Sequence, residues 1–290
     1  MKKITKVGLS ALAGALAISS ANAGEVSISG AMEITYITGS GYQDTGNGFG
    51  QDNEFTITAS TELDNGTSVA YKRTVNESFA GNDSELSFGT TFGTIAMTSA
   101  GSPISAIDDK TPTAFEEANA QVGSIDDVNG MDGTFGVRYT LADVMGSGMS
   151  LDAMWSPVHG TGDTHGDQGS SVAHGNGDAV EVTLTGSVPM VEGLSLGIGY
   201  ANLEEIRDYT GTVGASTDDQ DEGTGYITYA YGPFTAGYQV SAVSVGTSNT
   251  LYKTEYIGLS YSVSDNLSVS YNTIESNRTA QDGLVTEQEF

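Results

Sequence analysis

Apolar and polar residues alternate along most of the chain after its first two dozen residues. In residues 25–37 the side chains of Val26, Ile28, Ile34 and Tyr36 fall on one face, and small or polar residues fall on the other. This period of two indicates a β-strand with two different faces. A run of a dozen residues is longer than the five or six that are usual in soluble sheets. It is long enough for a tilted strand that crosses a membrane.

The same pattern predicts thirteen strands, with the start of a fourteenth at Leu284. The predicted strands are residues 25–37, 54–63 and 68–75, two strands within 84–98, and then 134–141, 149–156, 178–188, 194–201, 225–231, 234–243, 254–263 and 267–274. Short connections near residues 65, 93, 145, 191, 232 and 265 alternate with long ones. Transmembrane barrels show this parity because one rim has tight turns and the other has long loops. A soluble β-sandwich has no such rule.

One long connection, residues 99–133, is rich in paired acids. The acids are Asp108, Asp109, Glu116, Glu117, Asp126 and Asp127. A loop of this length is uncommon in a compact β-protein and is usually functional or disordered. We expect this third loop to fold into a barrel lumen and narrow a pore. The alternative is a solvated surface loop whose charges serve solubility.

Composition agrees with a membrane barrel. Hydrophobic residues make up 38% of the chain, and no run after residue 23 is long and apolar enough for a membrane-spanning helix. A chain that crosses a bilayer without such helices must form a closed barrel, because lipid offers the backbone no hydrogen bonds. Cysteine is absent, which excludes disulfides and thiolate chemistry.

The formal net charge is −27, from 10 basic and 37 acidic residues. Nucleic acid is therefore excluded as a partner, because neutralising phosphates needs a basic surface. Cations and cation-bridged surfaces suit so negative a chain.

Residues 1–23 have the form of a secretory signal peptide. Lys2, Lys3 and Lys6 precede a short apolar stretch, and Ala21 and Ala23 form a small-x-small cleavage site. The alternative, a membrane anchor, would need a longer apolar run. We expect residues 24–290 to form the barrel.

The sequence resembles the general porins of Gram-negative outer membranes. The matching stretches are the leader with residues 25–36, Leu86-Ser-Phe-Gly-Thr-Thr-Phe-Gly-Thr94, Gly136-Val-Arg-Tyr139 and residues 258–271. The resemblance implies an all-β fold, a 16-stranded antiparallel transmembrane β-barrel with an inward third loop. It also implies a homotrimer in the outer membrane, in contact with lipid and lipopolysaccharide, through which small hydrophilic solutes diffuse.

Porins of this family finish on an alternating strand that ends in Phe. Here Phe290 is terminal, but residues 285–289 are too polar for that strand. An unclosed barrel would leave two sheet edges unpaired in lipid. We therefore expect the chain to be C-terminally incomplete.

Two basic residues are predicted to face the lumen. Lys72 shares its strand face with Ala70 and Thr74, and Arg138 shares its face with Gly136 and Thr140. Cations on the wall opposite acids on the loop would set up a transverse field. Since the acids dominate, we expect a cation-preferring channel. Alternatively, the acids lie outside the barrel and bind divalent cations that bridge lipopolysaccharide phosphates.

No cofactor is expected beyond such loosely bound divalent cations, and no catalytic motif is present. His159, His165 and His174 share one loop, which we interpret as flexible and exposed rather than as a metal site. An enzyme is therefore not expected. The alternative function from another class is a secreted or surface-displayed adhesin or structural β-protein without a channel.

Overall fold

The computed structural model describes residues 25–36, 49–76, 81–113, 127–159, 177–204, 219–245, 250–265, 267–279 and 285–289. The chain divides into two compact units, Met1–Thr91 and Phe92–Phe290. Among the described residues, no helix is long and apolar enough to cross a bilayer.

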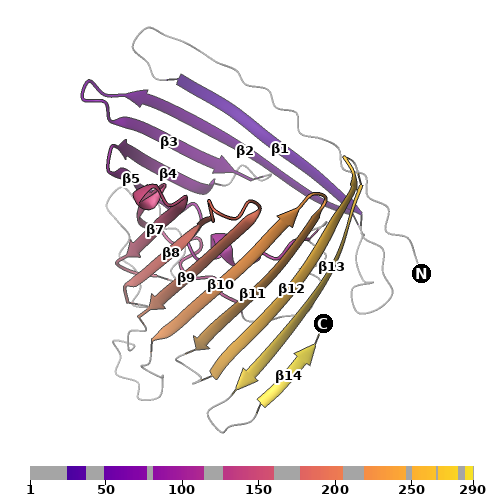
Figure 1. Ribbon diagram of the computed structural model, residues 1–290. Helices are drawn as coiled ribbons and strands as arrows, with labels where there is room; N and C mark the ends of the chain where they lie inside the picture. The colour runs from indigo at the N-terminus through magenta and orange to yellow at the C-terminus, as the bar shows by residue number, and fades with distance from the viewer. Residues whose placement is uncertain are drawn as a thin grey trace, which may run out of the picture. The chain divides into compact units, whose positions relative to one another are not determined.

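The first unit is an antiparallel sheet in which strands that are neighbours in sequence pair in space (Figure 1). Its strands are β1 (Glu25–Tyr36), β2 (Phe49–Glu62), β3 (Ser68–Val75) and β4 (Gly81–Thr90). The turn between β2 and β3 depends on Asn65 and Gly66. The Asn65 side chain accepts a hydrogen bond from the Thr67 amide, 3.1 Å, and Gly66 has a φ of +80°. A short connection therefore lies near residue 65, as the strand pattern predicted, and Gly66 supplies its left-handed residue.

The second unit continues the same antiparallel pattern, each strand pairing with the next (Figure 1). Its strands are β5 (Gly93–Thr98), β6 (Gly136–Leu141), β7 (Met149–Ser156), β8 (Ala179–Ser187), β9 (Leu194–Leu203), β10 (Gln220–Tyr231), β11 (Phe234–Val245), β12 (Thr250–Ser264), β13 (Leu267–Thr279) and β14 (Val285–Glu289). Two short 3-10 helices lie in its connections, η1 (Ser105–Ile107) and η2 (Val144–Gly146).

In the sheet of the second unit, here the second sheet, the exposure of apolar and polar side chains is the reverse of that in a soluble sheet. One face, here the apolar face, exposes large hydrophobic side chains such as Val182, Ile198 and Ile257. The other, here the polar face, buries polar residues such as Thr183 and Gln239. A soluble sheet hides its apolar side chains and exposes its polar ones. An exposed apolar face backed by a polar interior is what a barrel wall in lipid requires.

Several strands extend farther at their long-loop ends than the sequence pattern predicted. β10 begins at Gln220 rather than at residue 225, and β13 continues to Thr279 rather than to residue 274. β2 begins at Phe49 instead of residue 54. These extensions carry polar residues on both faces, so backbone pairing continues after the hydrophobic alternation has ended.

Candidate functional site

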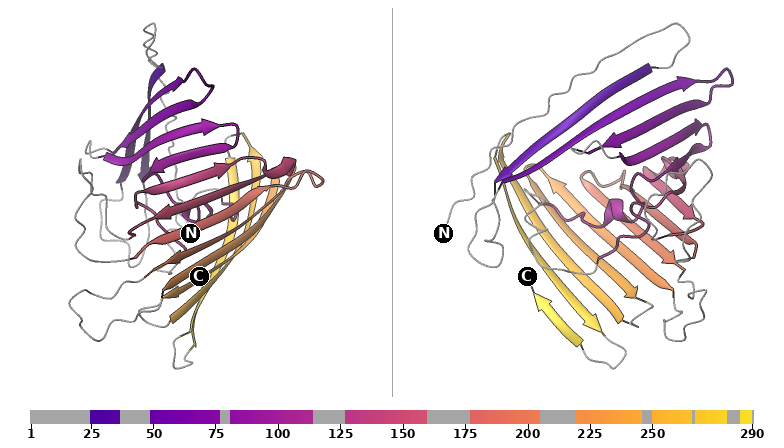
Figure 2. Two further views of the ribbon diagram at one scale, coloured as in Figure 1. Left: turned by 90° about the vertical axis from the view of Figure 1, so that its left-hand side faces the viewer. Right: turned by 180° about the vertical axis from the view of Figure 1, so that it is seen from behind.

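The loop between β5 and β6 lies across the polar face of the second sheet (Figure 2, right). Its described parts are residues 99–113, here the first limb, and residues 127–135, here the second limb. η1 lies in the first limb. The second limb ends in a turn in which the Thr134 amide donates to the Met131 carbonyl, 2.9 Å, so β6 begins two residues later than predicted.

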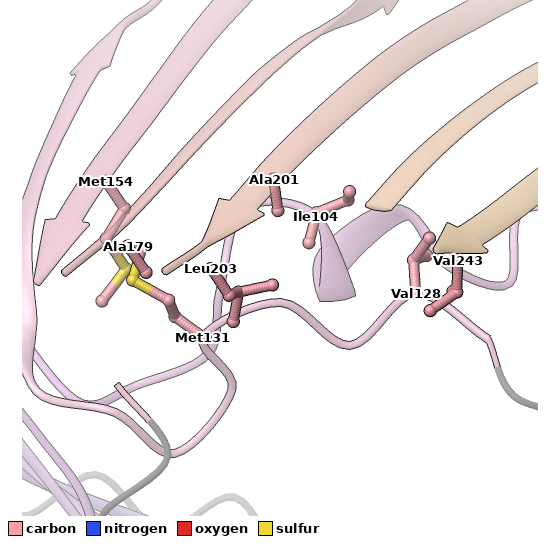
Figure 3. Close-up of a cluster of buried hydrophobic side chains, with 8 residues drawn as sticks. All are labelled: Ile104, Val128, Met131, Met154, Ala179, Ala201, Leu203 and Val243. Atoms are coloured by element: carbon pink, nitrogen blue, oxygen red, sulfur yellow. The ribbon is translucent and has the colours of Figure 1, made fainter. Parts of the chain in front are cut away.

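An apolar cluster seats both limbs on the sheet (Figure 3). It consists of Ile104, Val128, Met131, Met154, Ala179, Ala201, Leu203 and Val243. Three of these residues come from the loop and five from strands β7, β8, β9 and β11. Burial of hydrophobic side chains on an otherwise polar face therefore fixes one region of the loop against the wall.

Two strand carboxylates bind the loop backbone. Glu181 of β8 accepts hydrogen bonds from the amides of Ile104, at 3.3 Å, and Met131. Glu222 of β10 accepts from the amides of Asn129 and Gly130, both at 2.7 Å. Glu181 is 0% exposed and Glu222 is 2% exposed. These amides supply the hydrogen-bond donors that a buried carboxylate needs.

Amide side chains hold the first limb farther along the sheet. Gln239 of β11 donates to the carbonyls of Ile107, 2.8 Å, and Asp108, 2.6 Å, and accepts from the Lys110 amide, 2.7 Å. Asn272 of β13 donates to the Pro112 carbonyl, 3.0 Å. The first limb thus runs from β8 across to β13.

Glycines in the wall let the limb approach closely. A Cβ at Gly199 would lie 2.9 Å from Ile107 Cδ1. A Cβ at Gly237 would lie 2.5 Å from Pro112 Cδ, and one at Gly258 would lie 2.9 Å from the Pro112 carbonyl oxygen. At Gly199 the limb atoms that approach belong to side chains, whereas at Gly237 and Gly258 the limb's backbone approaches the strand as well.

Three of the predicted loop acids lie in the described limbs. Asp108 and Asp127 are partly buried, whereas Asp109 is exposed and lies 3.4 Å from the Lys110 ammonium. Asp127 accepts hydrogen bonds from its neighbour's amide, at 2.8 Å, and from the Tyr256 hydroxyl of β12. Glu116, Glu117 and Asp126 lie outside the described residues.

Burial shifts the titration of two of these acids. It raises the pKa of Asp108 to about 7, and the negative charges of Asp109 and Asp127 add to the rise. Burial also raises the pKa of Asp127 to about 6, with hydrogen bonds from the Val128 amide and Ser241 acting against the rise and Glu222 adding to it. Burial is the main cause of both shifts, and repulsion from neighbouring carboxylates adds to it.

The predicted basic residues lie in different units. Arg138 of β6 is on the polar face, where its Nε lies 3.0 Å from Oδ1 of Asp152 on β7. Lys72 of β3 is in the first unit and is paired in register with Thr58 and Glu85. It shares its strand face with Thr74, and its position facing the lumen stays a prediction.

Sequence reasoning missed the residues that hold the loop. Glu222 precedes the strand that was predicted from residue 225, but it is in β10 and buried. Glu181 was passed over, although it alternates with Ala179 and Thr183 on a strand whose other face is apolar. An acid on the polar face of such a strand was the available signal.

The histidine loop needs one correction. His159 is 4% exposed, and its Nε2 lies 2.9 Å from the carbonyl oxygen of Glu204. It is therefore a packed residue at the end of β7, not part of an exposed loop. His165 and His174 lie outside the described residues. Within the described ranges, no group of three or more His, Asp or Glu side chains could hold a metal ion.

Fold and strand pattern define a class: the chain is an all-β, antiparallel transmembrane barrel protein of the porin type. Salmonella typhi OmpF, solved in complex with daunomycin, resembles it with a TM-score of 0.60 and 14% identity, over 95% of this chain and 85% of that one. In-vitro folded OmpT of Vibrio cholerae gives 0.59 and 12%, over 93% and 81%. A trimer form of that OmpT gives 0.60 and 12%, over 92% and 82%.

At these identities the likenesses show the fold alone. The family follows from the sequence: the chain belongs to the Gram-negative porins, whose family model matches residues 8–288. No curated protein matches it. The protein is accordingly an outer-membrane porin, as the resemblance of its sequence implied.

Proposed function

We propose that this porin gives passive, cation-preferring diffusion of small hydrophilic solutes across the outer membrane. The observation that carries the proposal is the seating of an acidic loop on the polar face of a sheet whose other face is apolar. Because the apolar face suits lipid, the polar face lines the lumen, and the loop on it narrows the passage.

The cation preference rests on the charge balance around the loop. Asp108, Asp109 and Asp127 are in the limbs, and Glu181 and Glu222 are in the wall beneath them. Arg138 already has an acidic partner in Asp152, so its charge offsets little of this excess. Fixed negative charge at a constriction lowers the energy of a passing cation and raises that of an anion.

The remaining parts of the proposal concern the cell. Residues 1–23 are removed as a signal peptide during export, and the mature chain assembles as a homotrimer. The trimer form of Vibrio cholerae OmpT supports that assembly by likeness of fold. Lipid and lipopolysaccharide surround the apolar face, and the chain uses no cofactor beyond loosely bound divalent cations. The protein is a channel and not an enzyme.

The test is the reversal potential of the reconstituted protein in a planar bilayer under a salt gradient. A stable conductance with a potential on the cation side is expected. A folded, assembled protein without conductance would overturn the channel assignment. A potential on the anion side would leave a channel but refute the role of the acidic loop.

A further inference from the structure

Glu181 joins the two limbs of the loop through separate oxygen atoms. Its Oε2 accepts the amide hydrogen of Ile104 in the first limb, and its Oε1 accepts that of Met131 in the second limb. These two limb residues are 27 positions apart in the sequence. One side chain from β8 thereby holds both ends of the loop.

Glu222 also binds the loop but in a different way. A single oxygen, Oε2, accepts from both the Asn129 and the Gly130 amides. The other oxygen, Oε1, accepts from the Gln220 side chain of the same strand, 2.7 Å. Glu222 therefore contacts the second limb alone and uses one acceptor atom for it.

Packing encloses the Glu181 carboxylate. Gly130 has a φ of +52°, and a Cβ there would lie 2.1 Å from Glu181 Oε1 and 2.4 Å from Ile104 Cγ2. Ile104 and Met131, whose amides donate to Glu181, also belong to the apolar cluster. The same residues therefore make both the hydrogen bonds and the hydrophobic contacts. Neither limb can separate from the wall without depriving a buried carboxylate oxygen of its hydrogen bond.

We propose that Glu181 is the positioning residue that fixes the constriction loop, because this single wall side chain hydrogen-bonds to both limbs. The Ser102 hydroxyl also joins the limbs, by donating to the Asn129 carbonyl at 3.4 Å, but it does not attach them to the wall through that bond. The proposal rests on the channel function proposed above. A carboxylate presents acceptor lone pairs on both oxygens, whereas a glutamine presents one acceptor oxygen and one NH₂ donor. Glu181→Gln must therefore place an NH₂ group against one limb's amide. Glu222→Gln can keep its oxygen toward the loop and turn its NH₂ toward Gln220, whose amide can reverse to accept.

The experiment compares Glu181→Gln with Glu222→Gln, which removes an equal formal charge from the same wall. Glu255→Gln on the exposed side of β12 is the distant control. Hydrogen exchange is measured by mass spectrometry on segments 100–113 and 127–135, together with single-channel conductance. In Glu181→Gln we expect about tenfold faster exchange in both limbs and altered, noisier conductance. In Glu222→Gln we expect exchange within about twofold of the original chain.

Two results would overturn the proposal: exchange in Glu181→Gln like that of the original chain, or equal loosening by both variants. If Glu181→Gln does not assemble, hydrogen exchange of the original chain tests the proposal instead. The amides of Ile104 and Met131 should then exchange with one common opening rate, and independent opening of the two would refute the tie. The channel function is judged separately, since its failure is an original chain that does not conduct.

Discussion

Arg138 and Asp152 form an ion pair across the β6–β7 strands, with Nε and Oδ1 3.0 Å apart. The Thr140 hydroxyl also donates to Asp152. The arginine that the sequence placed on the pore wall is thus largely balanced by a carboxylate that the sequence did not single out.

Opposite substitutions in this pair should shift selectivity in opposite directions. Asp152→Asn leaves the Arg138 charge unbalanced and should lower cation preference, whereas Arg138→Gln leaves Asp152 unbalanced and should raise it. Each change should cost about 1–2 kcal/mol of folding stability, since both side chains are partly exposed. The reversal potential measures the shift. Lys253→Gln on the apolar face is the control, and equal shifts in both pore variants would refute the placement of the pair in the lumen.

Neutralising the acids at the middle of the loop should weaken the cation preference. The variant replaces Asp108, Asp109, Glu116 and Glu117 with their amides, which removes up to four negative charges from the proposed constriction. The reversal potential should move toward zero while the variant still folds and assembles. Unchanged selectivity in a correctly assembled variant would contradict the constriction assignment.

Cation preference should also fall on acidification. The pKa of Asp108 is raised from 3.8 to about 7 and that of Asp127 from 3.8 to about 6, both by burial first. The groups that surround these two carboxylates are Asp109, Lys110, Glu222, Ser241 and Tyr256. Both acids therefore gain protons between roughly pH 8 and pH 5, where ordinary aspartates stay ionised. Reversal potentials measured across this range should show the change, and the double variant Asp108→Asn, Asp127→Asn should flatten it.

The same shifts fix the sign of the effect on stability. Between pH 3.8 and about 7 the folded loop binds more protons at Asp108 than the unfolded chain does, so this residue's contribution becomes less favourable as pH rises. Hydrogen exchange of the two limbs should accordingly quicken from pH 5 to pH 7, after correction for intrinsic exchange. Slower corrected exchange over this interval would contradict the direction of the shift.

Strand alternation predicted the fold because lipid enforces it on every strand. Side chains such as Ile198 and Ile257 must meet lipid while their neighbours on the chain face the interior, so the period of two survives in the sequence. The alternation weakened where strands extend beyond the apolar zone. Residues such as Glu222 and Glu275 are paired regularly with neighbouring strands, although polar residues at these positions in the sequence predict a loop.

The site was harder to predict, because its contacts join residues far apart in sequence. The acidic composition of residues 99–133 indicated the constriction loop. The alternation of polar and apolar positions predicted that Lys72 and Arg138 lie on the polar faces of their strands. Neither signal says that Glu181 and Gln239 will bind backbone amides 50 and 129 positions away. Gly237 likewise looks like any strand glycine until Pro112 is found against it.

Filling the space at Gly237 should displace the first limb from the wall. In Gly237→Ala the new Cβ would lie 2.5 Å from Pro112 Cδ and 3.3 Å from Thr111 Cα, so the limb must shift. Such overpacking costs about 1–3 kcal/mol and should speed hydrogen exchange in segment 100–113 while changing single-channel conductance. The matched control is Gly225→Ala on the neighbouring strand, where the nearest atom would lie 3.6 Å away. If the two alanine variants exchange and conduct alike, the limb does not rest on Gly237.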